Sequence, residues 1–140
     1  MTRILLVRHC EAMGNTQGVF QGQIDCDISG NAPAQLELLA LRCRNMPIDV
    51  MYSSPLTRAY KTACAIDRYH HLPIHRDRRL MEINGGEWEG KAWKDLPSLF
   101  PEEALQWNTC PWEFAPKGGE SMRSVYDRMW RAMTDIVDRN

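Results

Sequence analysis

The sequence has little net charge and no long hydrophobic run. Its 140 residues include 17 Lys and Arg against 18 Asp and Glu, which gives a formal net charge of −1. A general nucleic-acid-binding domain would be clearly basic, so this balance argues against one. The aliphatic run Ile4–Val7 ends as soon as charge returns, and it is too short for a membrane span or a secretion signal. We therefore expect a cytoplasmic protein that binds neither nucleic acid nor a membrane.

Paired cysteines are also absent. The cysteines are odd in number and show no C-x-x-C spacing (Cys10, Cys26, Cys43, Cys64 and Cys110). This pattern is typical of reduced thiols in a cytosolic protein, and it argues against a disulfide framework or a zinc site. Hydrophobic residues make up 44% and charged residues 25%, an ordinary globular composition. The length is sufficient for one domain, residues 1–140, and too short for two.

Hydrophobic patterning predicts strands that alternate with helices. The predicted elements are strands at Ile4–Val7 and Asp49–Tyr52, an extended piece at 80–83, and helices over 31–46, from Pro55 and from about Glu120. The first strand is purely aliphatic and should be buried on both faces. Ser54 is expected to cap the helix that starts at Pro55. This alternation is typical of an α/β layer fold with a largely parallel sheet.

Polar side chains follow both predicted strands. Arg8, His9, Glu11 and Asn15 come after the first strand, and Arg58 lies near the start of the helix after the second. In open α/β sheets, ligands gather beyond the carboxyl ends of the strands. Arginine offers a fork of donors that matches phosphate oxygens, a helix N-terminus adds N–H groups, and a neutral imidazole can accept a phosphoryl group. A lone His or Arg here is usually structural, but the combination predicts a phosphate-handling site with His9 as nucleophile.

Five segments carry motifs in a recognisable order. They are RHCEA followed by Asn15 (8–15), QG followed by DIS (21–29), SSPLTRAYKTA (53–63), LMEINGGEWEG (80–90) and GGES (118–121). Together they resemble the histidine phosphatase superfamily, the phosphoglycerate-mutase-like proteins, over the whole chain. The resemblance implies a three-layer α/β sandwich with a mostly parallel sheet.

The resemblance also implies roles at the matching positions. His9 would be the phosphorylated nucleophile, and Glu82 would protonate the departing alkoxide and then activate water. The residues expected to hold the phosphate are Arg8, Asn15, Gln21, Gly22 and Arg58. Because the arginines would neutralise the phosphoryl oxygens, neither a metal ion nor a cofactor is expected. The partner would be a phosphorylated small molecule; sugar phosphates, phosphoglycerates and nucleotide-derived esters stay open, as do phosphoproteins.

Two positions depart from the family pattern. Cys10 stands where the family usually has Gly, and it would place a thiol beside the phosphate; we interpret it as a tolerated small residue. The family's second catalytic histidine lies in a V-S-H-G segment after the helix that follows GGES, and no such segment occurs up to Asn140. We therefore expect a C-terminally truncated domain. Its first strand would have an open apolar edge, which favours a homo-oligomer.

Other classes of site fit less well. A cysteine phosphatase needs C-x5-R, and no cysteine has an arginine six residues later. The segment 25–30 imitates half of a calcium loop, but Leu36 stands where a glutamate is required. Within the family, the 37 positions between Glu82 and Gly119 match the compact phosphatase branch, since resembling mutases carry a longer insertion. A phosphoglycerate mutase-type isomerase and a catalytically impaired phosphate-binding fragment remain alternatives.

Overall fold

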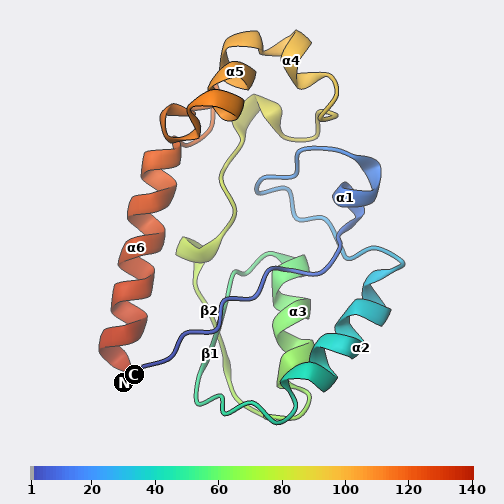
Figure 1. Cartoon of the computed structure of the whole chain (residues 1–140), viewed down its shortest axis with the longest axis vertical. Coiled ribbons are helices and arrows are strands. Elements are labelled where there is room, and N and C mark those ends of the chain that lie inside the picture. The colour runs from blue at the N-terminus through green and yellow to red at the C-terminus, as the bar shows by residue number, and fades with distance from the viewer. Residues whose placement is uncertain (1) are drawn as a thin grey trace.

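Two short parallel strands lie beside a pair of helices in the computed structural model, which describes residues 2–140 (Figure 1). The helices are α1 (Met13–Gln17), α2 (Ala32–Cys43), α3 (Thr57–Asp67), α4 (Leu96–Leu99), α5 (Pro101–Thr109) and α6 (Met122–Arg139), and the strands are β1 (Met51–Ser53) and β2 (Ile74–Arg76). The strands pair in parallel, with Met51 opposite Ile74. The α/β fold with a parallel sheet is confirmed, although the sheet within residues 2–140 has only these two strands.

Two hydrophobic clusters hold the elements together. The first joins α2, β1 and α3 through Cys43, Met51, Ala63 and Ile66. The second surrounds Trp88, which is 1% exposed. Its other buried members are Phe20, Ile83, Leu96 of α4, Ala104 of α5, Phe114 and Val125 of α6. The Trp88 indole nitrogen donates to Glu103 Oε2 at 2.5 Å, so its one polar group is paired inside this cluster. In Figure 1, α4 and α5 form a lobe at one end of the molecule, and the long helix α6 descends from it.

The predicted first strand is not formed, and its predicted burial is wrong. The side chains of Ile4–Val7 are between 40% and 80% exposed, and no strand within residues 2–140 pairs with them. The physical reason is the lack of a neighbour: β1 pairs with β2 alone. An aliphatic run of this kind forms a buried strand only where adjacent strands and flanking helices cover it.

The helix that carries Arg58 begins two residues later than predicted. Leu56, and not Ser54, is the N-cap residue, and the Ser54 hydroxyl accepts from the Leu56 N–H at 3.3 Å. The first free N–H of α3, that of Thr57, donates to the Asp25 carboxylate at 2.6 Å. The N-terminus of α3 is therefore capped by a carboxylate 32 positions earlier in the chain, and not by Ser54 as predicted.

The other predicted elements are close to the observed ones. The helix expected over 31–46 is α2, and the helix expected from Glu120 is α6, with Ser121 as its N-cap. The segment 80–83 begins at the end of a 3₁₀ turn and continues as an unpaired extended stretch. None of the helices in the described part of the chain has the length and apolarity needed to cross a membrane.

Candidate active site

His9 presents one ring nitrogen for chemistry and uses the other for positioning. Its half-buried ring lies with Nδ1 2.6 Å from the carbonyl oxygen of Cys10. A carbonyl oxygen can only accept, so Nδ1 carries the proton and the neutral ring keeps its lone pair on Nε2. Burial lowers the pKa of His9, and the charges of Arg58 and Arg8 lower it further, against the hydrogen bond to Cys10 and the carboxylate of Glu82. The result is a neutral imidazole with a nucleophilic Nε2.

The loop that carries His9 is fastened to α3 by one hydroxyl. The N–H of Cys10 donates to Thr62 Oγ1 at 2.9 Å, and the same hydroxyl donates to the carbonyl oxygen of Arg58 at 2.8 Å. The Cys10 thiol is buried against α3, 4.0 Å from that carbonyl. The thiol therefore packs into the protein and does not lie open beside His9, as a tolerated small residue should.

Arg58 is almost completely buried, at 2% exposure. Its guanidinium donates through Nη1 to the carbonyl oxygen of Ile24 at 2.9 Å and through Nη2 to that of Gly22 at 2.7 Å. These bonds fix the fork in one orientation at the first turn of α3, and donors remain for an anion because arginine has five N–H groups. Arg8 is different: its side chain is exposed, and it reaches His9 through its charge.

The 21–23 loop is held from its other side by Glu89. Glu89 Oε1 accepts from the N–H of Gln23 at 2.8 Å and from that of Gly85 at 2.9 Å. Gly22 has a φ of +53°, and a Cβ there would come within 2.2 Å of Glu89 Oε1. Only glycine fits this position without moving the carboxylate, so the motif keeps Gly22 for its backbone.

The side chains of Gln21 and Asn15, the other two expected phosphate contacts, differ in their hydrogen bonds. Gln21 is buried, and its Oε1 has no hydrogen-bond partner within residues 2–140. A buried carbonyl oxygen without a partner is costly, and because it can only accept, it suits a donor group of a ligand and not an oxygen of a phosphate dianion. Asn15 Oδ1 accepts from the N–H of Ala12 at 2.9 Å and thereby caps α1. Its amide nitrogen is the part that can contact an anion.

Glu82 is exposed and lies within electrostatic reach of His9, whose pKa its carboxylate raises. One carboxylate oxygen accepts from the N–H of Ile83 at 3.0 Å. The backbone carbonyl of Glu82 accepts from Gln23 Nε2, also at 3.0 Å. His9, Arg58, Arg8 and Glu82 are thus brought together from separate segments of the chain, although the roles expected for them remain predictions.

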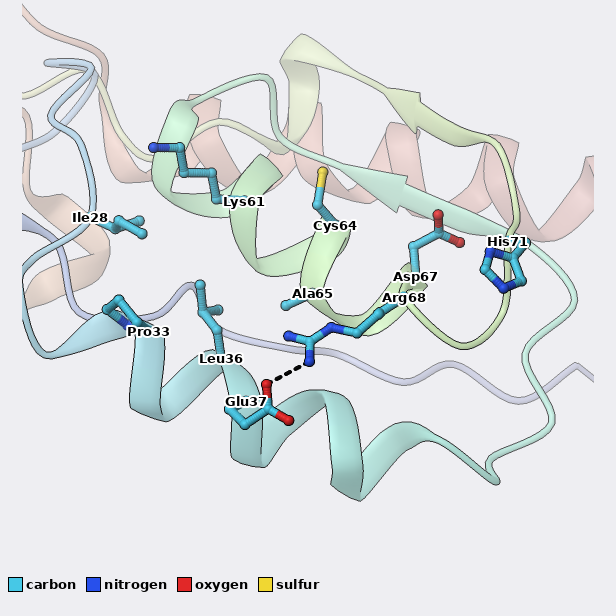
Figure 2. Close-up of a pocket in the computed structure, with 10 residues that line it drawn as sticks. All are labelled: Ile28, Pro33, Leu36, Glu37, Lys61, Cys64, Ala65, Asp67, Arg68 and His71. Carbon is cyan, nitrogen blue, oxygen red and sulfur yellow. Dashed lines mark hydrogen bonds and ion pairs between the residues drawn. The ribbon is translucent and has the colours of Figure 1, made fainter.

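The other three histidines lie elsewhere. His70 donates from Nε2 to the carbonyl oxygen of Cys43 at 3.0 Å, beyond the end of α3 that is opposite Arg58. His75 packs on Tyr52, with ring centroids 5.1 Å apart. His71 lines an open groove of about 770 Å³ between α2 and α3, which contains no candidate site residue (Figure 2). Across residues 2–140, no group of three or more His, Cys, Asp or Glu side chains is arranged to hold a metal ion.

Sequence reasoning missed four residues that build the site. Three of them, Thr62, Gln23 and Glu120, lie inside or beside the motifs, but the motifs did not indicate what these side chains contact. Arg128 lies outside every motif, on α6, and donates to backbone carbonyls around Glu82. Its periodic position on a polar helix face gives no sign of this contact.

Comparison with known proteins identifies the family. The model of the histidine phosphatase superfamily (branch 1) matches residues 4–140. The chain is 35% identical over 140 residues to phosphoserine phosphatase 1 of Hydrogenobacter thermophilus, covering 100% of this chain and 66% of the relative. It is 34% identical over 139 residues to glucosyl-3-phosphoglycerate phosphatase of Mycolicibacterium vanbaalenii, covering 96% of this chain and 60% of the relative.

Solved structures give the same result. YhfR of Bacillus stearothermophilus matches with a TM-score of 0.89 at 30% identity, over 95% of this chain and 66% of that one. A mycobacterial glucosyl-3-phosphoglycerate phosphatase in complex with VO3 matches with a TM-score of 0.87 at 28% identity, over 94% and 63%. The chain thus spans from 60% to 66% of the length of these relatives. It has the phosphoglycerate-mutase-like α/β fold, and it belongs to the histidine phosphatase superfamily, branch 1.

Proposed function

We propose that this chain hydrolyses phosphomonoesters through a phosphohistidine at His9, without a metal ion. The observation that carries the proposal is the state of His9: Nδ1 donates to Cys10, and Nε2 has a lone pair beside the charges of Arg58 and Arg8. Nε2 attacks phosphorus, the bond from phosphorus to the ester oxygen breaks, and Glu82 gives its proton to the departing alkoxide. Glu82 then takes a proton from water, which attacks the phosphohistidine and releases inorganic phosphate.

The arginines supply what a metal ion would otherwise supply. Charge on the phosphoryl oxygens develops between Arg8 and Arg58, and donors fixed before the reaction stabilise such charge most effectively. Asn15, Gln21 and Gly22 complete the proposed phosphate site, with Asn15 and Gln21 donating from their side-chain amide nitrogens.

The proposed substrate is a phosphorylated small molecule. Relatives named as phosphoserine phosphatase and glucosyl-3-phosphoglycerate phosphatase, at 35% and 34% identity, support this class. A relative named as 2,3-bisphosphoglycerate-dependent phosphoglycerate mutase, from Mesorhizobium japonicum, is 30% identical over 132 residues and keeps the isomerase alternative open. The compact spacing from Glu82 to Gly119 favours hydrolysis, since access of water decides between the two outcomes.

A form that binds phosphate with little turnover is the second candidate. It is favoured by the positions of His70, His71 and His75, which all lie away from His9. Loss of one donor to a transferring group typically costs about a hundred- to a thousand-fold in rate. Retention of Glu82 counts against a pure binder, which has no use for an acid.

The test is covalent labelling. The chain is incubated briefly with a reactive phosphate donor at neutral pH, and the acid-labile adduct is mapped by mass spectrometry. We expect the label on His9, none in a His9→Ala variant, and normal labelling in His75→Ala, a control at an exposed histidine. Label that persists in His9→Ala would refute the proposal. Release of phosphate from an aryl phosphate, compared with isomerisation of a phosphoglycerate, separates hydrolase from mutase.

A further inference from the structure

Arg128 of α6 uses every one of its donors. Nε and Nη2 donate to the two oxygens of Glu120 at 2.8 and 2.7 Å. Nη1 donates to the carbonyl oxygens of Arg79 and Met81, both at 2.7 Å, and Nη2 donates also to that of Glu82 at 3.0 Å. Five hydrogen bonds thus satisfy the five N–H groups of a guanidinium.

The Glu120 carboxylate completes this arrangement. It accepts from the N–H of Asn84 at 2.9 Å, and the Glu120 N–H returns a bond to the Asn84 carbonyl at 2.9 Å. Both side chains are about four-fifths buried, and the pKa of Glu120 is lowered by Arg128 and by the Asn84 N–H. Arg128 and Glu120 therefore hydrogen-bond to the backbone at both ends of the segment 79–84.

Glu82 lies in the middle of that segment, and its own side chain does little to fix it. The exposed carboxylate has one hydrogen bond, to the neighbouring Ile83 N–H. Its backbone carbonyl, by contrast, accepts from two directions, from Arg128 and from Gln23 of the loop that Arg58 holds. The distance of the carboxylate from His9 is therefore set through the backbone.

We infer that Arg128, oriented by Glu120, is a positioning residue. It holds Glu82 at the distance from His9 at which its carboxyl group can protonate the leaving alkoxide of an ester attacked by His9. The inference rests on the proposed function in giving Glu82 that task. Proton transfer requires hydrogen-bond reach, and a small displacement of the acid is enough to slow it strongly. The segment 79–84 has no strand partner, so Arg128 supplies the fixation that a sheet would otherwise provide.

The arrangement differs from two other ion pairs of α6: Asp135 pairs with the Arg79 side chain at 2.5 Å and does not reach Glu82, and Arg123 pairs away from the segment. Arg123 pairs with Glu113, with side chains 56% and 52% exposed, and neither group contacts the segment 79–84. Such a surface pair contributes little. Arg123→Lys is therefore a matched control, because it makes the same arginine-to-lysine change as Arg128→Lys at another ion-paired position of α6.

The first test needs no turnover. The pKa of the His9 imidazole is measured by NMR titration in the wild-type chain, in Glu82→Gln, in Arg128→Lys and in the double variant. Glu82→Gln should lower this pKa, because the carboxylate raises it. Arg128→Lys keeps the charge and loses the fork, so it should lower the His9 pKa only while Glu82 is present. In the double variant the pKa should equal that of Glu82→Gln, and Arg123→Lys should leave it unchanged.

The second test follows the leaving group. Arg128→Lys should slow an alkyl phosphate by about ten-fold or more and an aryl phosphate by less than about three-fold, because aryl leaving groups need little protonation. A defect of folding would slow both substrates equally, and Glu120→Gln should show the same selectivity as Arg128→Lys.

The inference is overturned if Arg128→Lys leaves the His9 pKa unchanged, or shifts it equally with and without the Glu82 carboxylate. Equal slowing of both substrates overturns it as well. If the wild-type chain neither hydrolyses a phosphate ester nor takes label on His9, the proposed function fails instead. The titration then still decides whether Arg128 places Glu82.

Discussion

Burial favours the unprotonated, nucleophilic form of His9 at mildly acidic pH, where an exposed histidine is largely protonated. Reaction at Nε2 needs the unprotonated ring, so its rate rises with pH through the His9 pKa. Burial, with Arg58 and Arg8, lowers that pKa, and the midpoint therefore moves to a pH below that of an unperturbed histidine. We expect diethyl pyrocarbonate to modify His9 with a midpoint below that of a histidine in a short unstructured peptide. The measurement is the rate at each pH, mapped by mass spectrometry; a midpoint above the peptide's would contradict the prediction.

At this scale the sequence was informative where chemistry demands one residue type. His9, Arg58 and Glu82 were singled out because they follow predicted strands or lie in motifs, and their roles remain predictions. Thr62 and Arg128 could not be given roles, because a threonine or arginine on a helix is usually solvated, and only tertiary contact distinguishes them. The direction of the Cys10 thiol, which packs against α3, likewise depends on tertiary contact.

The start of α3 depends on a residue from a distant loop. Asp25 accepts from the N–H of Thr57 at 2.6 Å and from its hydroxyl at 3.0 Å. We expect Asp25→Ala to lower the free energy of unfolding by about 1 kcal/mol, the usual loss for an N-cap. Urea unfolding measures it, and Asp49→Ala, at another exposed aspartate, is the control. Equal losses in the two variants would show that Asp25 does not cap the helix.

Helices were easier to predict than strands. The stripes of α2 and α6 repeat over several turns, so their existence did not depend on any single residue. Strand β2 has only three residues, Ile74–Arg76, which is too few for a period to appear. The segment Ile4–Val7 has the composition of a buried strand, but pairing is a property of neighbours, and none lies beside it within residues 2–140.

The exposed segment Ile4–Val7 affects the molecule as a whole. An apolar extended stretch with open backbone groups invites pairing with another chain. We therefore expect the chain to self-associate, and Leu6→Lys to shift it toward the monomer in sedimentation velocity. Leu38→Lys, at a leucine of α2 that is 70% exposed, is the control and should leave the distribution unchanged. A wild-type chain that is monomeric at high concentration would refute this expectation.

Phosphoryl transfer by the whole chain should not depend on a divalent cation. Arg8 and Arg58 provide positive charge at His9, and no cluster of three metal-ligating side chains occurs across residues 2–140. Labelling of His9 and release of phosphate should therefore be the same in excess chelator as in its absence. Complete loss of both, restored by magnesium, would contradict the prediction.

The two arginines beside His9 enter binding with different amounts of conformational freedom. Arg58 is held by the carbonyls of Gly22 and Ile24 before any ligand arrives, so an anion that engages it freezes almost no side-chain rotation. Arg8 is exposed, and ordering such a side chain costs up to about 2 kcal/mol in entropy. A phosphoryl group bound between the two arginines should therefore cost side-chain entropy mainly at Arg8. At the proposed phosphate site, the motion that Arg8 loses on binding then offsets part of the attraction that its charge adds.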